Sequence, residues 1–248
     1  MTLRTCAALA LILAASIPAT GDEMPPIPPM ASYQFGLLRK GPAWTAKRTP
    51  ATDSIQAGHM ANIQRMWEEG VLVAAGPVLD GGDLRGVFIF HVDSAAQVRA
   101  LAARDPAIQA RRLVLDLHTW NAPPGIGEPY RRLAKHPRFR DSMITLQLGL
   151  LRRGPKATDA VTPALEQLRI AHVRGILEGL ASGELATAGP CSESGDLQGV
   201  LVYRGDSTAA RRRALEDPAV RAGEFRIEMH PWLSAYGNMP GDTLAPAR

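Results

Sequence analysis

Four of the six histidines fall at matched places in two stretches of the chain, and each stretch also carries a matched aspartate. His59 corresponds to His172, and Asp105 corresponds to Asp217. Imidazole exchanges protons near neutral pH, and a general acid or base needs a second group that orients its ring. We therefore expect His59–Asp105 and His172–Asp217 to be candidate acid–base pairs. The alternative is structural: an aspartate that ends a helix before proline, and a histidine buried against a sheet.

The other histidines point less clearly to chemistry. His118 and His230 each precede a tryptophan by two residues at the end of an expected strand, so we interpret them as amphipathic edge residues. His91 and His136 have no counterpart. No group of His, Cys, Asp and Glu has metal-ligand spacing, and the chain has no glycine-rich phosphate loop or nucleophile elbow. We expect no metal and no cofactor.

The matched residues belong to an internal repeat. Five blocks of similar sequence recur at an offset of 112 or 113 residues, which chance does not explain. The blocks are 35–42 and 148–155, 75–77 and 188–190, 82–87 and 195–200, 105–107 and 217–219, and 115–120 and 227–232.

Each half shows the same pattern of expected elements. In the first half we predict strands over 33–38, 71–75, 86–92 and 112–117, a helix from Asp53 or Ser54 to about 69, and a helix from Ser94 to about 104. The order β-α-β-β-α-β is the ferredoxin-like arrangement, an α+β fold with both helices on one sheet face. Because the open sheet faces must be covered, we expect the two repeats to pack as an intramolecular, pseudo-dimeric α/β barrel in a monomeric chain.

The N-terminal residues suggest that the protein is exported. Residues 1–21 combine a positive start, an apolar run of about a dozen residues and small residues for cleavage, which is typical of a signal peptide. An uncleaved membrane anchor is the alternative. We expect a secreted or periplasmic protein with no membrane span after cleavage. The expected segments are a Pro-rich tether over 22–31, domains over 32–120 and 143–237, a basic linker over 121–142 and a flexible tail over 238–248.

The charge of the chain is modest. The formal net charge is +4, and no nucleic-acid-binding motif accompanies it, so we expect no nucleic-acid partner. Basic residues gather in the linker, which is either a solvated connector or a strip that attracts anions. Cys191 stands in a turn, where we interpret it as a passive small residue.

Each half resembles a YCII-related domain. The resemblance rests on a histidine in the first helix, a strand that leads into Ala-Gly-Pro, a glycine-rich turn, and Asp-Pro after the second helix. In the first half these are His59, 75–77, 82–86 and 105–106, and in the second half His172, 188–190, 195–199 and 217–218.

The resemblance implies a ferredoxin-like fold that pairs into a dimeric α/β barrel, and a cleft in which the histidine and the Asp-Pro aspartate act as an acid–base dyad. Some relatives resemble muconolactone isomerases and dehydrochlorinases. The chain departs from the family pattern in three ways. Arginine three residues before the histidine is present as Arg169 but replaced by Gln56 in the first half, alanine follows Asp-Pro in both halves, and export is unusual. The first departure favours the second half as the active one.

Three functions follow as hypotheses. The first is a lyase or isomerase in which His172 moves a proton, Asp217 orients it, and an arginine holds a small anionic substrate. The candidate substrate-binding arginines are Arg169, Arg152 and Arg39. The second is a non-catalytic exported module that binds a small ligand or a partner in the barrel cleft. The third is a structural role in the cell envelope.

Overall fold

The computed structural model describes residues 23–193 and 195–243. The predicted signal peptide over 1–21 lies outside these residues. No helix in the described ranges is both long and apolar enough to cross a membrane.

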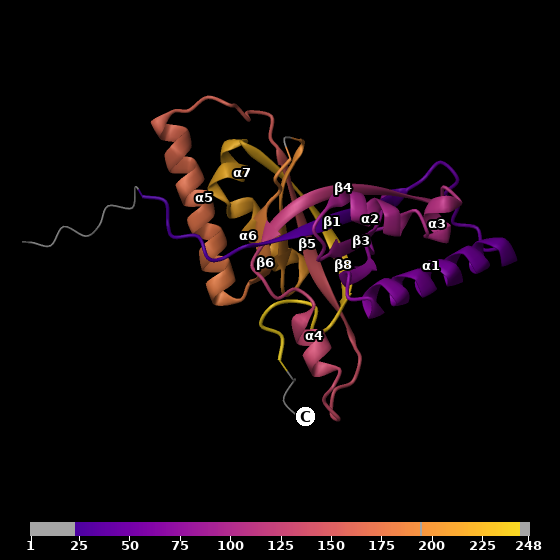
Figure 1. Cartoon of the computed structure of the whole chain (residues 1–248). Coiled ribbons are helices and arrows are strands. Elements are labelled where there is room, and N and C mark those ends of the chain that lie inside the picture. Colours follow the sequence, from indigo (N-terminus) through magenta and orange to yellow (C-terminus); the bar gives the residue numbers. More distant parts are fainter. Residues whose placement is uncertain (1–22, 194, 244–248) are drawn as a thin grey trace, which may run out of the picture.

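Two runs of helices and strands follow one another along the chain (Figure 1). The first run contains β1 (Ala31–Lys40), α1 (Pro50–Glu68), β2 (Leu72–Pro77), β3 (Leu84–Phe90), α2 (Ala95–Ala102), α3 (Pro106–Gln109) and β4 (Leu113–Ala122). After α4 (Glu128–Leu133) the second run contains β5 (Met143–Arg153), α5 (Pro163–Ser182), β6 (Leu185–Pro190), β7 (Leu197–Tyr203), α6 (Ser207–Glu216), α7 (Pro218–Ala222) and β8 (Phe225–Ala235).

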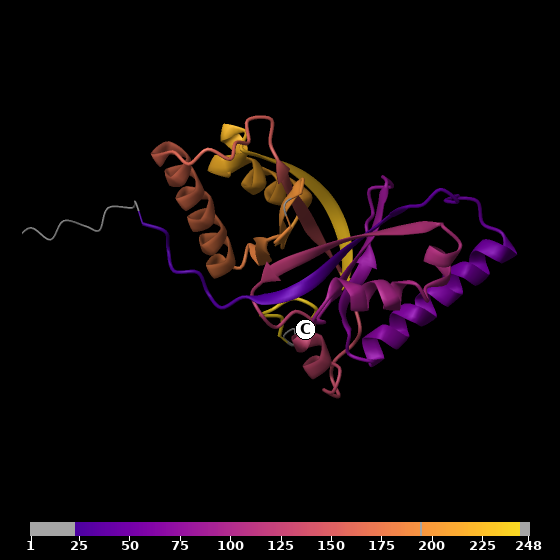
Figure 2. The same ribbon diagram turned by 45° about the horizontal axis from the view of Figure 1, so that its top comes forward.

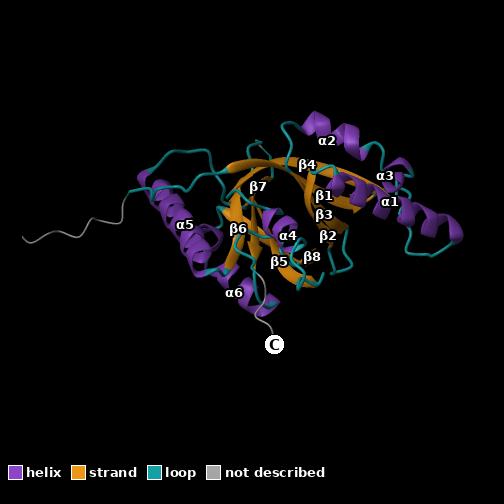
Figure 3. Ribbon diagram, turned by 60° about the horizontal axis from the view of Figure 1, so that its bottom comes forward, coloured by secondary structure: helices purple, strands orange, loops and turns teal. Residues whose placement is uncertain are grey.

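The strands form two four-stranded antiparallel sheets, which confirms the predicted α+β class. The strand orders are β2-β3-β1-β4 and β6-β7-β5-β8, so the same topology occurs twice. Helices cover the outer face of each sheet, and the two sheets face each other at the centre (Figure 2, Figure 3). The largest apolar cluster lies between the sheets and includes Phe35, Trp120, Leu148 and Trp232, all of them fully buried.

The edges of the two sheets also meet. The amide of Leu79 after β2 donates to the carbonyl of Pro231 on β8, and the amide of Ser192 after β6 donates to the carbonyl of Thr119 on β4. Both hydrogen bonds are 2.9 Å long. The two edge contacts are therefore equivalent, and each joins a turn of one half to the last strand of the other.

The glycine of each Ala-Gly-Pro block permits these edge contacts. A Cβ atom at Gly76 would lie 1.8 Å from the carbonyl oxygen of Leu233, and one at Gly189 would lie 1.8 Å from that of Asn121. No side chain fits at such a distance, so the motif is required where the backbones of the two halves approach each other.

Substituting Gly76→Ala is expected to lower the free energy of unfolding by about 1 to 3 kcal/mol, because the added methyl group forces the sheet edges apart. Gly195→Ala is the matched control, since a Cβ there would meet nothing within 4 Å. Urea unfolding of both variants measures the difference. Equal stability of the two variants would show that the edge contact is not tight.

Several elements begin or end at other residues than the sequence predicts. The first long helix begins at Pro50, before the predicted start at Asp53 or Ser54, because Thr49 caps it and exchanges hydrogen bonds with Thr52. The first strand begins at Ala31, inside the expected tether over 22–31. The linker predicted over 121–142 begins within β4 and contains α4, whose Leu133 is buried.

The C-terminal residues are partly packed. The flexible tail was predicted from residue 238, but Met239 and Asp242 are buried. The carboxylate of Asp242 accepts hydrogen bonds from the amides of Gly237 and Met239, and it pairs with Arg204 at 2.6 Å. These contacts fix the chain through Asp242, and residues 244–248 lie outside the described residues.

Candidate active site

The second half brings His172 and Asp217 together. His172 lies in the middle of α5, and Asp217 lies at the junction between α6 and α7. Nδ1 of His172 is 2.6 Å from Oδ2 of Asp217. The side chains are 12% and 14% exposed, so the pair is largely withdrawn from water. The contact between the helices is present, and the catalytic role of the pair remains a prediction.

The Asp-Pro motif holds the carboxylate in place. Asp217 is the N-cap of α7, and its Oδ1 accepts hydrogen bonds from the amides of Ala219 and Val220. Oδ2 is thereby left to face His172. Burial acts to raise the pKa of the Asp217 carboxyl, but the hydrogen bond and charge of His172, with the two amides, together bring that pKa below its ordinary value. The motif therefore positions a carboxylate as well as ending α6.

The first half contains the same contact in a tighter setting. Nδ1 of His59 is 2.8 Å from Oδ2 of Asp105, and Oδ1 of Asp105 accepts from the amides of Ala107 and Ile108. Asn62 adds a donor to Oδ2 at 3.0 Å. Asp105 is fully buried. In the second half Gly175 stands at the position of Asn62 and offers no side-chain donor. The first pair is thus more completely enclosed and hydrogen-bonded.

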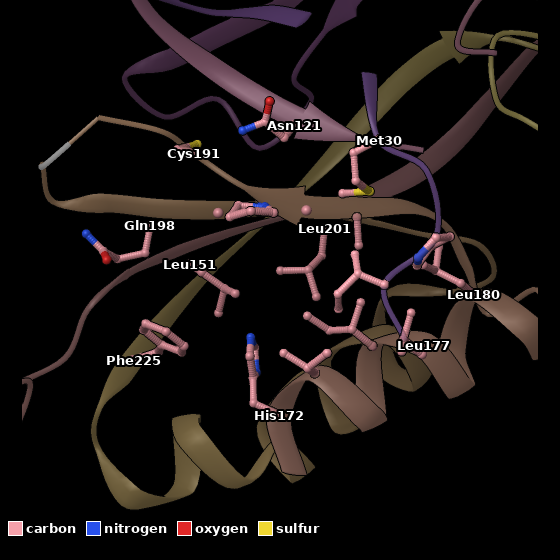
Figure 4. A pocket seen from close by; sticks show the side chains of 18 residues that line it. Met30, Asn121, Leu151, His172, Leu177, Leu180, Cys191, Gln198, Leu201 and Phe225 are labelled. Atoms are coloured by element: carbon pink, nitrogen blue, oxygen red, sulfur yellow. The ribbon is translucent and has the colours of Figure 1, made fainter. Parts of the chain in front are cut away.

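A cavity of about 440 Å³ lies between α5 and the second sheet, and His172 lines it (Figure 4). The ring of His172 rises from α5 toward the strands, close to Phe225, with ring centroids 5.1 Å apart. Since Nδ1 is engaged by Asp217, Nε2 is the ring atom that remains for a bound molecule. The volume lies within the range of ordinary small-ligand sites.

The surroundings of His59 in the first half differ from those of His172. His59 lines none of five cavities found among the described residues, the one beside His172 included. Its ring stacks on Phe88 with centroids 6.0 Å apart, and the matched residue in the second half is the smaller Leu201. Trp44 packs on the same core, and its matched residue is Ala157. A larger side chain therefore packs against His59, whereas a cavity lies beside His172.

The predicted substrate-binding arginines lie elsewhere. Arg152 is buried and pairs with Glu228 at 2.8 Å and with Asp196 at 3.1 Å. Arg39 makes the corresponding contacts to Asp83 and Asp116 in the first half. Arg169 is half-buried on α5, and none of the three belongs to the lining of the His172 cavity. Their role in holding an anion remains untested, and the geometry gives Arg39 and Arg152 a role in ion pairs at the sheet ends.

The second pair of matched histidines lies at the contacts between the halves. Nδ1 of His230 is 2.5 Å from Oδ2 of Asp80, which belongs to the turn after β2. Nε2 of His118 is 3.1 Å from Asp116. The interpretation of these histidines as edge residues agrees with their positions, but His230 also connects one half to the other.

Sequence reasoning missed part of the cavity wall. Ile27, Pro28 and Met30, from the segment before β1, line the cavity of the second half, and so does Cys191. Burial, with the nearby charge of Glu193, raises the pKa of the Cys191 thiol to about 12, so it remains protonated. The matched blocks of the repeat begin at residue 35, so the comparison of the two halves gave no indication that the segment before β1 lines a cavity of the second half.

The basic linker is partly structural. Arg131 donates to the carbonyl of Trp67 at 2.7 Å, and its guanidinium lies 5.1 Å from the Trp67 ring centroid. This arginine therefore anchors α4 to α1. The described residues contain no group of three or more His, Cys, Asp and Glu that could hold a metal ion.

The depressed carboxyl pKa predicts acid sensitivity. The folded state holds Asp217 ionised below the ordinary aspartate pKa of about 3.9, so the stabilisation is complete above that value and is lost as pH falls through the folded pKa. We expect Asp217→Asn to make the free energy of unfolding fall less steeply between about pH 5 and pH 2. Urea unfolding across this range measures the slopes, and identical slopes for parent and variant would contradict the expectation.

Comparison with known proteins agrees with the fold. The model of the YCII-related domain matches residues 40–117, so the first half contains a YCII-related domain. No curated protein matches the chain. Among solved structures, a variant of chlorite dismutase from Candidatus Nitrospira defluvii aligns with a TM-score of 0.53 and 9% identity, covering 82% of this chain and 90% of the other.

A second solved structure gives the same result. Chlorite dismutase from the same organism, in complex with imidazole, aligns with a TM-score of 0.51 and 10% identity over 84% of this chain and 90% of the other. At such identities the likeness concerns the fold alone. The fold is thus similar to that of these ferredoxin-type proteins, and the function has to be argued from the site.

Proposed function

We propose that this protein is a small-molecule enzyme of the lyase or isomerase kind, in which His172 is the proton-transferring base and acid. The observation that supports the proposal is the histidine ring that lines the cavity while its Nδ1 is held by Asp217. An oriented imidazole at a substrate-sized cavity is the arrangement that general acid–base catalysis requires.

The proton balance of the step is simple. With the Nδ1 proton donated to Asp217, Nε2 carries the lone pair and takes a proton from a substrate carbon next to a carbonyl group. The electrons of the C–H bond move to the carbonyl as an enolate. His172 then returns the proton to another carbon, or a leaving group departs with the electron pair and takes the proton from His172. The Asp217 carboxylate stabilises the imidazolium that exists between the two steps.

The finer architecture belongs to the same proposal. We regard the second half as a second YCII-like domain, because its strand order and its His–Asp contact match those of the first. The two edge contacts and the shared apolar core support an intramolecular, pseudo-dimeric α/β barrel. We further propose that the protein is exported to the periplasm or outside the cell and that it is a monomer.

A non-catalytic binding module is the second candidate. The observation that favours it is the apolar character of the cavity, whose lining is mainly leucine, isoleucine, valine and small residues. In that case His172 would contribute a hydrogen bond to the ligand and no chemistry.

Deuterium incorporation distinguishes the two candidates while the substrate is still unidentified. The protein is incubated in D₂O with a panel of unsaturated ketones, lactones and aldehydes, and mass spectrometry follows exchange at carbon. The proposed enzyme catalyses exchange in at least one compound, and the exchange is lost in His172→Gln. Binding of panel members without any catalysed exchange would support the binding module and contradict the enzyme.

A further inference from the structure

The cavity beside His172 lacks fixed charge. Figure 4 shows 18 lining residues, and no Asp, Glu, Lys or Arg is among them. His172 and Cys191 are the titratable members, and the thiol is protonated. Most of the remaining surface comes from aliphatic side chains and from Phe225.

An anionic ligand would find no net positive charge here. When His172 is protonated, the Asp217 carboxylate at 2.6 Å balances its charge. Arg152, on the strand that carries the lining residue Leu151, is engaged by Glu228 and Asp196. Burying a carboxylate without a partner is strongly unfavourable, so the lining favours an uncharged molecule.

The cavity runs along α5. Five α5 residues from His172 to Leu180 line it, a separation of eight residues that corresponds to about 12 Å of helix. His172 lies at one end, and the leucines Leu177 and Leu180 lie toward the other. A molecule that fits is therefore elongated, with its polar group at the histidine.

The two other polar side chains in the lining each use an amide N–H within the protein. The side-chain amide of Asn121 donates to Ser192, and that of Gln198 donates to the carbonyl of Gly195. We assign the ligand's polar group to Nε2 of His172, because Asp217 holds this ring at Nδ1 and the ring lines the cavity.

The N-terminal segment closes the apolar part of the cavity. Ile27, Pro28 and Met30 cross from the first half and lie over the second (Figure 2). Ile27 is 53% exposed and Met30 is 37% exposed, so both side chains lie at the rim with one face toward the cavity and one toward water. Such residues gain burial when an apolar ligand fills the space beneath them.

We propose that the cavity binds an uncharged, elongated, mainly apolar molecule with one polar group, such as a hydroxyl or carbonyl, at Nε2 of His172, and that Ile27 and Met30 form the part of its wall that selects for the apolar chain. Only the position of the polar group at His172 depends on the proposed function. Binding itself does not require catalysis.

Decan-1-ol and decanoate are matched probes, because they share chain length and differ in charge. Thermal-shift and calorimetric titrations of the purified protein at pH 8 are expected to show decan-1-ol binding at least tenfold more tightly than decanoate. Tighter binding of decanoate would overturn the proposal. Weak binding of both probes would overturn it equally.

Variants locate the site. Leu180→Trp introduces the side chain that the first half has as Trp67, and it is expected to abolish binding of decan-1-ol, as is the milder Leu177→Phe. Gln167→Trp is the control, since Gln167 is exposed on the same helix and lies outside the lining. Unchanged binding in a folded Leu180→Trp or Leu177→Phe variant would place the ligand elsewhere and contradict the proposal.

The wall is tested separately. Ile27→Ser with Met30→Ser is expected to weaken decan-1-ol binding about fivefold or more, because apolar contact is lost, whereas Met24→Ser is expected to have no effect. Equal affinity in all variants would remove the segment from the site. His172→Gln removes the ring that meets the polar group and is expected to weaken decan-1-ol binding about two- to tenfold, the loss of about one net hydrogen bond. Unchanged affinity would contradict the placing of the polar group at His172. If the protein binds decan-1-ol but catalyses no exchange, the proposed reaction is contradicted and the proposed ligand class is still supported.

Discussion

Replacing Asp105 with alanine is expected to lower the free energy of unfolding by about 3 to 5 kcal/mol, because it leaves a buried group of donors without their acceptor. The Asp105 carboxylate is fully buried and accepts from the His59 ring, from Asn62 and from two backbone amides. Burial acts to raise the pKa of this carboxyl, but the hydrogen bond to His59 and the other donors lower it overall. The charge is therefore strongly held by the fold.

Asp217→Ala is the matched variant for this prediction. The Asp217 side chain is 14% exposed against 1% for Asp105, and Gly175 offers no donor where the first half has Asn62. We expect a smaller loss of stability from Asp217→Ala, measured by urea unfolding at pH 7. A larger loss from Asp217→Ala would mean that the two halves have been assigned the wrong roles.

Replacing His172 with glutamine is expected to reduce the rate of catalysed exchange by about 10²- to 10⁴-fold, the usual contribution of a positioned acid or base. Glutamine keeps a polar side chain of similar length, and the cavity beside the ring gives it room, so the fold should remain. The rate is measured as deuterium incorporation into the compound that the panel identifies, with ligand affinity followed in parallel.

His59→Gln supplies the control for the His172 prediction. The ring of His59 packs against Phe88 and does not line the cavity beside His172, so exchange should stay within about threefold of the parent, an effect no greater than that of one net hydrogen bond. An equal loss in both variants would point to an effect on the fold as a whole. A loss in His59→Gln alone would move the active site to the first half.

The sequence was sufficient to predict the contact partners in both halves. Because the repeat keeps one helix with a histidine and another that ends at Asp-Pro, the ferredoxin-like order was enough to expect His59 near Asp105 and His172 near Asp217. The sheets and their antiparallel pairing followed from the same periodicity. The start of the first helix did not, because a Thr-Pro cap at residues 49–50 competes with Asp53 and Ser54, whereas the predicted cap of the second helix, Ser94, is confirmed.

The Asp-Pro motif shows a second feature that the sequence did not predict. Read as a stop signal, it hid the short helices α3 and α7, which the aspartates cap. That geometry explains why an aspartate is suited to the position. One oxygen binds the helix N-terminus and the other remains for the histidine, a division that spacing alone does not reveal.

The inequality of the halves arises mainly from tertiary packing. The contrast between Arg169 and Gln56 favoured the second half, but Arg169 does not line the cavity. The space depends on Leu201 in place of Phe88, and on an N-terminal segment that reaches across to the other half. The exchange of Phe88 for Leu201 is visible when the repeats are aligned, but its effect on the cavity is not, and the path of the N-terminal segment does not follow from the repeats at all.

Nuclear magnetic resonance of the histidine side chains tests the central claim most directly. The ring resonances are assigned with His172→Gln and His59→Gln, and decan-1-ol is then titrated into the protein. A ligand seated in the α5 cavity is predicted to shift the ring resonances of His172 and to leave those of His59 unchanged. Shifts at His59, or shifts at neither ring on saturation, would contradict the assignment of the site to the second half.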